Sequence, residues 1–359
     1  MFDIFCKVID NYGDAGVCLR LCRDLTKNNF EVNLFIDNID TLKKLLSNED
    51  IYNENLRIYS LNKIIENYQP SNVVIQAFSQ RLEYSLLKKI KKNNSLVINL
   101  DYLTAESFAE SCHCLPSYTD EIESYFFFPG FTKKTGGLII ENDFREKLKN
   151  FVENKTTDIV SVSLFSYQNI NVNFFVNFLY NSKKFFKVKV FEGKPADTIN
   201  SIFNIKLEKI KSLTIRNIEF YYSEFVNQTE YDNILINSDI NLVRGEDSIV
   251  RAMLSGKPFL WNIYPQEDNY HINKINALFK VISEKCSNKS AVEKIRYLTL
   301  KYNSLDADSD ITEIKIDDFF DEWKILAKEW SKYLLSMNSL TNNLLQFTIE
   351  HMKICKQSR

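Results

Sequence analysis

The stretch Arg244-Gly245-Glu246-Asp247-Ser248 decides the fold of this chain. It follows an apolar run that ends in Leu242-Val243, and it precedes a helix-like segment, 249–254, closed by Gly256. A buried strand, a tight turn at a glycine and a helix start together direct backbone N–H groups at one point, which is how proteins bind phosphate groups. Two adjacent carboxylates are unusual in a site for phosphate alone, so we expect this turn to do more than hold an anion.

Strand-like and helix-like segments alternate along the chain before this turn and around it. The apolar, β-branched runs that we expect to form buried parallel strands are 2–9, 31–36, 72–78, 96–100, 159–165, 187–191, 218–222, 240–243 and 258–263. Helix-length segments lie between the early runs, at 17–28, 41–46 and 82–92. Such alternation predicts an α/β protein with two Rossmann-like domains that face each other across a cleft. Ligands in such sheets bind at the carboxyl ends of the strands.

The expected domains are 1–155, 156–335 and a short C-terminal extension. Residues 143–157 read as a charged helix, after which the strand–helix pattern starts again. The chain from 316 to about 356 is helical, with one apolar face formed by Phe319, Phe320, Trp323, Ala327, Trp330 and Leu334. Residues 336–359 form a helical tail that can pack back on the N-terminal domain.

The bulk composition indicates a cytosolic globular protein. The 359 residues are 45% hydrophobic and 26% charged, which is ordinary for a globular chain with two cores. A net charge of −2 offers no basic field for nucleic acid or for an anionic membrane. No segment approaches the roughly 18 apolar residues of a membrane span. We expect neither nucleic acid nor membrane among the partners.

A second candidate turn, Asp10-Asn11-Tyr12-Gly13-Asp14-Ala15-Gly16, follows the first expected strand and opens the first helix. One interpretation is structural: Asp14 caps the helix and Asp10 ends the strand. The other is chemical, because two carboxylates at the mouth of a cleft suit a cationic acceptor or a general base. The turn is not GxGxxG, so dinucleotide binding and a dehydrogenase are disfavoured.

The second half carries candidate residues for a nucleotide. Asp247 or Ser248 could be the N-cap of the helix, which still leaves other first-turn amides for a ligand. Three basic residues near the turn could balance the charge of a diphosphate: Arg244, Arg251 and Lys257. Aromatic and amide side chains in loops after strands could stack on a base and read its edge, although each aromatic alone is more typical of a core: Phe165, Tyr167, Phe225 and Gln228.

Two further patterns suggest metal binding, but both are weak. Cys112-His113-Cys114 has no second CxxC or HxxxH pair that would complete a zinc site, and the seven scattered cysteines fit reduced structural thiols. The Asp-x-Asp repeats in 306–310 resemble the metal-holding pair of some glycosyltransferases, yet they do not follow an apolar strand. We expect no bound metal and no cofactor.

Together these segments resemble one family, the protein-arginine rhamnosyltransferases that modify elongation factor P. The resemblance runs in order over most of the chain. It rests on Phe2-Asp3-Ile4-Phe5-Cys6, 10–18, 125–132, 135–138, Ser163-Leu164-Phe165, 241–248 and Trp261-Asn262-Ile263-Tyr264-Pro265-Gln266. Departures such as Tyr12, Ala15 and Ser166 are conservative or lie outside the residues with expected chemical roles.

The resemblance implies a GT-B glycosyltransferase with an acceptor-side domain, 1–155, and a nucleotide-sugar domain, 156–335. It implies inverting, metal-independent transfer of L-rhamnose from the donor substrate dTDP-β-L-rhamnose to an arginine of elongation factor P. Asp14 would be the general base, Asp10 its carboxylate companion, and Glu246 a residue needed for activity. The donor would be bound by Phe165, Tyr167, Phe225, Gln228, Arg244, Gly245, Asp247 and Ser248.

Two other functions remain open on the sequence. A GT-B transferase could use a different nucleotide sugar or acceptor, because the fold hosts many donors. A non-catalytic nucleotide-sugar binding module is the alternative of another class. The carboxylates of Asp10, Asp14 and Glu246 argue against a module without chemistry.

Overall fold

The computed structural model of the chain consists of two compact units. The first comprises Met1–Arg145 with Met337–Arg359, and the second comprises Glu146–Ser336. The structure describes residues 1–9, 12–61, 67–78, 80–119, 122–151, 158–167, 171–266, 268, 270–305 and 314–357. The boundary expected at 155 falls in 152–157, outside the described residues.

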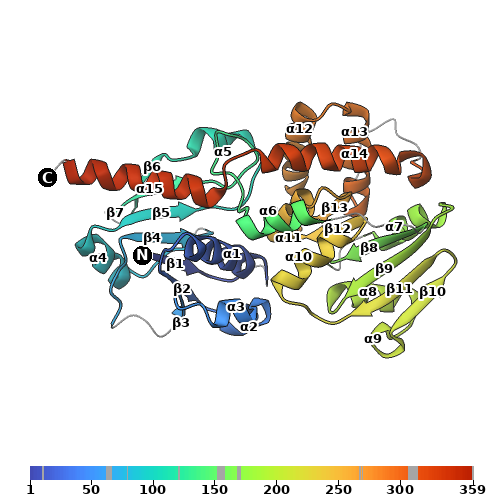
Figure 1. The fold of residues 1–359 in the computed structure, drawn as a ribbon, viewed down its shortest axis with the longest axis horizontal. Helices are drawn as coiled ribbons and strands as arrows, with labels where there is room; N and C mark the ends of the chain where they lie inside the picture. Colours follow the sequence, from blue (N-terminus) through green and yellow to red (C-terminus); the bar gives the residue numbers. More distant parts are fainter. Residues whose placement is uncertain are drawn as a thin grey trace. The chain divides into compact units, whose positions relative to one another are not determined.

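A seven-stranded sheet forms the centre of the first unit, in the order β3-β2-β1-β4-β5-β7-β6 (Figure 1). The neighbouring strands pair in parallel except β6, which is antiparallel to β7. Every residue of the central strand β1 is buried, as expected for a strand covered on both faces. The strands are β1 (Phe2–Cys6), β2 (Val32–Ile36), β3 (Leu56–Ser60), β4 (Val73–Ala77), β5 (Leu96–Leu100), β6 (Pro116–Thr119) and β7 (Ile122–Phe127).

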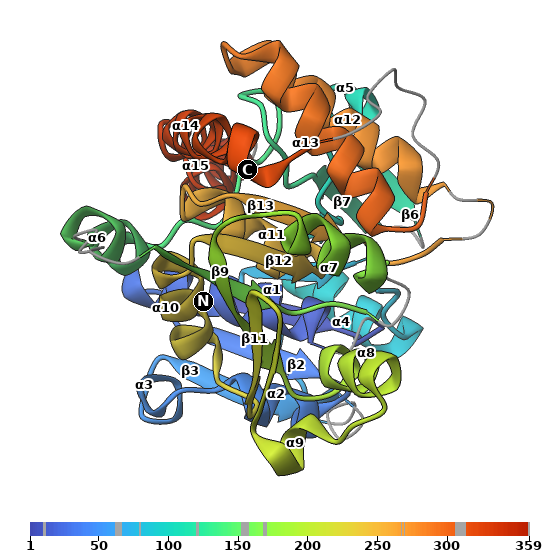
Figure 2. The same ribbon diagram turned by 90° about the vertical axis from the view of Figure 1, so that its right-hand side faces the viewer.

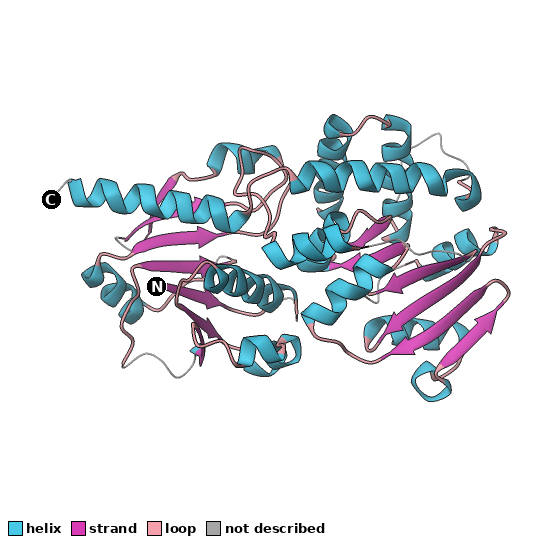
Figure 3. Cartoon of the chain, in the orientation of Figure 1, coloured by secondary structure: helices cyan, strands magenta, loops and turns pink. Residues whose placement is uncertain are grey.

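Helices cover this sheet, and one of them comes from the far end of the chain. In Figure 3 the helix α15 runs along the first sheet, and it contacts both α1 and β5. Its first residue donates a backbone hydrogen bond from Leu340 N to Leu138 O, 2.6 Å long. The helices are α1 (Gly13–Lys27), α2 (Ile39–Leu45), α3 (Asn48–Ile51), α4 (Tyr84–Asn93), α5 (Ser107–Cys112), α6 (Asn142–Asn150), which crosses into the second unit, and α15 (Leu340–Gln357).

The second unit repeats the architecture with six strands in the order β10-β11-β9-β8-β12-β13 (Figure 1). Figure 2 shows the sheet from the side, with α11 next to β12 and β13. All pairs are parallel except β10 with β11. The strands are β8 (Ile159–Leu164), β9 (Phe185–Phe191), β10 (Ser212–Ile215), β11 (Ile218–Ser223), β12 (Ile240–Arg244) and β13 (Phe259–Asn262). The fold class is therefore α/β with two parallel-dominated sheets, as predicted.

The helices of the second unit are α7 (Val172–Tyr180), α8 (Lys194–Phe203), α9 (Leu207–Ile210), α10 (Gln228–Asn237), α11 (Gly245–Leu254), α12 (His271–Lys285), α13 (Lys289–Tyr302) and α14 (Ile316–Leu335). The predicted apolar face of α14 is confirmed, since all six of its residues from Phe319 to Leu334 are buried. Across the described residues, no helix is both long and apolar enough to span a membrane.

The sequence prediction missed four strands, β3, β6, β7 and β10, and a break in the tail. In β3 and β10 exposed residues alternate with less exposed ones, because one face meets solvent, and the continuous apolar run that signals a buried strand is absent. The tail is two helices rather than one: α14 ends at Leu335 and α15 begins at Leu340. The chain leaves the second unit there and pairs Ser339 with Leu138 of the first.

Candidate functional site

The candidate nucleotide residues gather at the point where the second sheet reverses its strand order. From β8 the chain adds β9, β11 and β10 on one side, and then β12 and β13 on the other. Connections that leave adjacent strands in opposite directions open a crevice at their carboxyl ends, where α/β proteins bind ligands. Phe165 directly follows β8 and Gly245 directly follows β12, so both flank this point.

The turn from β12 to α11 has no intervening loop. Gly245 has a φ of +66°, in the left-handed region that favours glycine, and α11 begins at that residue. The indole of Trp261 secures the turn by donating to Gly245 O over 3.0 Å. The predicted helix start after a buried strand is confirmed, and the first-turn amides that such a start presents suit an anion.

The interpretation of Asp247 or Ser248 as the N-cap is wrong. The N-cap is Arg244, with extended backbone and no side-chain cap, because the glycine places the helix start earlier than the polar residues suggested. Glu246 and Asp247 lie in the first turn and are half-buried, while Ser248 is buried. Negative side chains in a first turn are favourable beside the positive end of the helix dipole.

Arg244 folds back over the loop that follows β8. Its guanidinium lies 4.3 Å from the ring centre of Phe165 and 4.8 Å from that of Tyr167. The same group donates from Nη1 to Ser166 O over 3.1 Å, and the side chain is buried. Arg244 thus joins the two loops of the crevice by a cation–π contact and a hydrogen bond.

The two aromatic residues of the β8 loop differ in exposure. Tyr167 is buried, and its backbone N–H donates to Asn262 Oδ1 over 2.6 Å. Phe165 stays half-exposed, with edge contacts to Phe191 and Tyr231 at 5.8 and 5.5 Å between ring centres. Only Phe165 therefore keeps ring surface on which a base can stack, whereas Tyr167 supports the loop from the core.

The loop after β11 brings the remaining nucleotide candidates to the same crevice. Gln228 opens α10 and is buried, and its amide donates to Asp247 Oδ2 over 3.0 Å. Phe225 is half-exposed, and its backbone N–H donates to Glu192 Oε2 over 3.0 Å. The structure therefore joins the starts of α10 and α11 through the Gln228–Asp247 hydrogen bond.

Sequence reasoning missed Tyr231, which lies on α10 one turn after Gln228. Its ring closes a triangle with Phe165 and Phe191. Burial raises the pKa of the Tyr231 hydroxyl, and the neighbouring Ser248 hydroxyl opposes that rise. The signal that could have found it is the helical spacing of three from Gln228.

Two of the three basic residues that could balance a diphosphate are occupied elsewhere. Arg251 is fully buried, with Nε 4.0 Å from the carboxylate of Asp232 on α10. Lys257 is buried, with its ammonium 4.6 Å from the ring centre of Phe151. Only Arg244 of this group lies at the turn.

In the first unit the strand order reverses between β1 and β4, and Asp14 lies just beyond the end of β1. The capping interpretation of Asp14 is wrong: Tyr12 is the N-cap and makes no side-chain cap, while Asp14 is the second residue of α1. Its buried carboxylate instead accepts from Ile9 N over 2.7 Å.

A second carboxylate, that of Asp37, lies near the end of β1 and was not among the predicted site residues. It accepts from Val8 N over 2.9 Å. The companion Asp10 lies outside the described residues.

Among the described residues, no group of three or more His, Cys, Asp or Glu side chains is placed to hold a metal ion. The two metal-binding patterns noted in the sequence therefore find no support in that part of the chain. His113 is structural: its Nδ1 accepts from Phe128 N over 3.2 Å, and burial lowers its pKa to about 4. The described cysteines are free thiols. The Asp-x-Asp segment 306–310 lies outside the described residues.

Two Rossmann-like units in one chain, with a helix start suited to phosphate at the order reversal of the second sheet, match the architecture of GT-B glycosyltransferases. Residues 2–349 match the family described as "Elongation-Factor P (EF-P) rhamnosyltransferase EarP". The chain belongs to this family, and it is a glycosyltransferase.

Individual relatives agree with that membership. A protein-arginine rhamnosyltransferase of Neisseria meningitidis is 29% identical, over 98% of this chain and 97% of its own. One from Shewanella oneidensis is 31% identical, over 78% and 80% of the two chains. A solved structure described as "Structural basis for EarP-mediated arginine glycosylation of translation elongation factor EF-P" is similar in fold. Its TM-score is 0.65 at 21% identity, with coverage of 97% of this chain and 98% of that one.

Proposed function

We propose that this protein transfers L-rhamnose from dTDP-β-L-rhamnose to an arginine of elongation factor P, with inversion at the anomeric carbon and without a metal. The observation that carries the proposal is the α11 turn, where Gly245, the first-turn amides and Glu246 follow Arg244, whose guanidinium lies over the half-exposed ring of Phe165. It is supported by family membership and by relatives named for arginine rhamnosylation. The acceptor is a translation factor, so the proposed reaction takes place in the cytoplasm.

The donor residues have distinct proposed tasks. Phe165 and Phe225 contact the thymine, with Gln228 and Tyr167 supporting them, because the two phenylalanines keep exposed ring surface and the other two are buried. The start of α11, with Gly245, Asp247 and Ser248, faces the diphosphate and sugar. Fixed amides and helix dipoles stabilise the charge that develops on a leaving diphosphate without reorganising.

The acceptor chemistry explains the carboxylates. A guanidinium has a pKa above about 12 and is a poor nucleophile while its charge is delocalised. A carboxylate can hold it by paired hydrogen bonds and accept a proton as the bond forms. In the proposed step the N–C1 bond forms, the C1–O bond to the diphosphate breaks, dTDP leaves and Asp14 takes the proton. Asp10 would share the guanidinium, and Glu246 would act at the sugar.

The decisive experiment is mass spectrometry of purified elongation factor P after incubation with this protein and dTDP-L-rhamnose. We expect a gain of one deoxyhexose on a single arginine, and no gain on a factor with that arginine replaced by lysine. Parallel reactions with other dTDP- and UDP-sugars test the donor. An unmodified factor, or equal transfer from a different nucleotide sugar, would overturn the proposal.

A further inference from the structure

Two buried amide side chains link the end of α13 to the loop that carries the half-exposed ring of Phe165. Asn303 directly follows α13 and Asn262 ends β13, and both side chains are buried. Asn262 Nδ2 donates to Asn303 Oδ1 over 3.0 Å, and Asn262 Oδ1 accepts from Tyr167 N over 2.6 Å. Buried parallel strands usually carry apolar residues, and a buried amide costs free energy unless its groups are paired. The pair therefore indicates a requirement beyond core packing.

Asn303 fixes the orientation of the Asn262 amide. Its Oδ1 also accepts from Ile263 N over 3.1 Å, and its Nδ2 donates to Trp261 O over 2.7 Å and to Thr299 O over 2.8 Å. A carboxamide has two N–H groups and two lone-pair directions, so these bonds use the full capacity of Asn303. The backbone on both sides of Asn262 is held as well, and its Oδ1 is left to face the β8 loop.

The Asn262 side chain holds the loop at a point that no backbone ladder reaches. The first two loop residues bond to β12: Phe165 N donates to Leu242 O over 2.9 Å, and Ser166 O accepts from Arg244. The third, Tyr167, bonds to the side chain at the end of β13, and β12 lies between β8 and β13. Two strand spacings are about 10 Å, which a side chain can help to bridge and a direct backbone hydrogen bond cannot.

We propose that Asn262 is a positioning residue for the donor nucleotide, an inference that rests on the proposed function. It fixes the end of segment 165–167 so that the ring of Phe165 is in place for the base of a nucleoside diphosphate, and Asn303 orients it. Phe165 directly follows β8, so the position of its ring depends on the backbone of this short segment. A ring that is ordered before binding spares the ligand the entropy cost of ordering it.

The first test measures the affinity of Asn262→Ala for dTDP by isothermal calorimetry. We expect the Kd to rise about five- to tenfold, the effect of one lost hydrogen bond. The KM for dTDP-L-rhamnose should rise by the same factor, while kcat and the KM for elongation factor P stay within about twofold. A purely structural amide would lower the melting temperature and leave the Kd of the folded protein unchanged. That outcome would overturn the proposal.

A double-mutant cycle tests the route through the ring. Phe165→Ala should weaken dTDP binding about tenfold, because it removes the stacking surface. If Asn262 acts through that ring, adding Asn262→Ala to this variant should weaken binding by no more than about twofold further. Independent, multiplicative losses would overturn the assignment of Asn262 to the position of Phe165.

The matched control is Asn217→Ala, at the opposite, amino edge of the same sheet. The Asn217 amide donates to Leu179 O, Ser182 O and Lys184 O over 2.9–3.1 Å, at the end of α7 and the approach to β9. Its loss should lower the melting temperature and leave the Kd for dTDP within about twofold. A rise in Kd equal to that of Asn262→Ala would contradict a specific effect on the nucleotide loop.

Hydrogen exchange of the wild-type chain provides a readout that does not depend on the folding of a variant. The Tyr167 amide should exchange slowly without nucleotide, since it donates to a buried acceptor. Fast exchange would overturn the proposal. Transfer and binding also separate the two levels of inference. A wild-type chain that binds dTDP with the expected coupling but transfers no sugar contradicts the proposed function alone, whereas one that does not bind dTDP contradicts both.

Discussion

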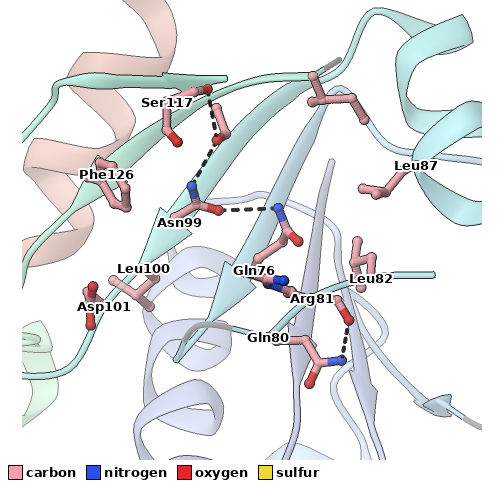
Figure 4. A pocket seen from close by; sticks show the side chains of 12 residues that line it. Gln76, Gln80, Arg81, Leu82, Leu87, Asn99, Leu100, Asp101, Ser117 and Phe126 are labelled. Atoms are coloured by element: carbon pink, nitrogen blue, oxygen red, sulfur yellow. Dashed lines mark hydrogen bonds between the residues drawn. The ribbon is translucent and has the colours of Figure 1, made fainter. Parts of the chain in front are cut away.

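The carboxyl edges of the two sheets share a topology but differ in how their side chains are used. At the β8/β12 reversal, Arg244 stacks on Phe165 and bonds to the neighbouring loop, while Gln228 bonds to Asp247. At the β1/β4 side, the buried carboxylate of Asp14 accepts from Ile9 N, and a polar cavity lies over β4 and β5 (Figure 4). One edge is built from loops that hydrogen-bond to each other, and the other carries a buried carboxylate and a polar cavity.

The difference fits two different ligands. A nucleotide diphosphate is the same molecule in every turnover, so its site gains from rings and amides fixed in advance. An arginine acceptor presents a cation, which a carboxylate can bind by paired hydrogen bonds. Substitutions at Asp14, Phe225 and Arg244 each change one edge, and each has a control residue in the same unit.

The largest effect is expected from Asp14→Asn. The amide can still accept from Ile9 N but cannot take the proton, so kcat should fall about 100- to 10,000-fold. Binding of dTDP-L-rhamnose by calorimetry should stay within about twofold, because the donor residues lie in the other unit.

Asp37→Asn is the control for that variant, since Asp37 also accepts one loop amide near the end of β1, from Val8. It should retain nearly full activity. An equal loss in both variants would mean that loop geometry, rather than a base at Asp14, explains the defect.

On the donor side, Phe225→Ala should lower the affinity for dTDP about tenfold, because stacking of a base on an aromatic ring is worth roughly 1–3 kcal/mol. Isothermal calorimetry with dTDP measures it directly. Phe174→Ala removes another half-exposed ring of the same unit, on α7, and should leave the affinity unchanged. Unchanged affinity in Phe225→Ala would contradict the thymine contact.

A smaller effect is expected from Arg244→Lys, which keeps the charge but loses the planar group that stacks on Phe165 and bonds to Ser166 O. We expect dTDP to bind about fivefold more weakly, the equivalent of about 1 kcal/mol. Arg216→Lys replaces an arginine stacked 4.8 Å over Tyr180 in the same unit and serves as the control. Equal binding by wild type and Arg244→Lys would mean that the arginine does not order the nucleotide loops.

Local sequence rules were sufficient to predict the centre of each sheet and the α11 turn. Buried parallel strands are continuous apolar runs, and Gly245 is the residue that tolerates the left-handed turn. The edge strands β3 and β10 were missed because their exposed face removes that signal. The break between α14 and α15 depends on Leu340 pairing with Leu138, a contact between residues distant in sequence.

The candidate site was predictable by residue type but not by contact. Strand ends identified Phe165 and Asp14, since topology alone places them at the order reversals. Three features of the site depend on how α10, α11 and the β8 loop pack together. Arg244 folds over Phe165, Tyr167 is buried, and Arg251 pairs with Asp232. Spacing along one segment carries no information on such contacts.

The smallest expected effect is that of metal removal. If the α11 turn stabilises the leaving diphosphate, excess EDTA should change the rate of transfer by less than about twofold, because amides and a helix dipole supply the electrostatic stabilisation that a divalent ion gives in other transferases. The residues described at that turn include two carboxylates but no grouped ligand set. Loss of activity that added Mg²⁺ or Mn²⁺ restores would contradict this account. It would assign a metal role to the Asp-x-Asp segment 306–310, and Asp306→Asn with Asp308→Asn would then reproduce the effect of EDTA.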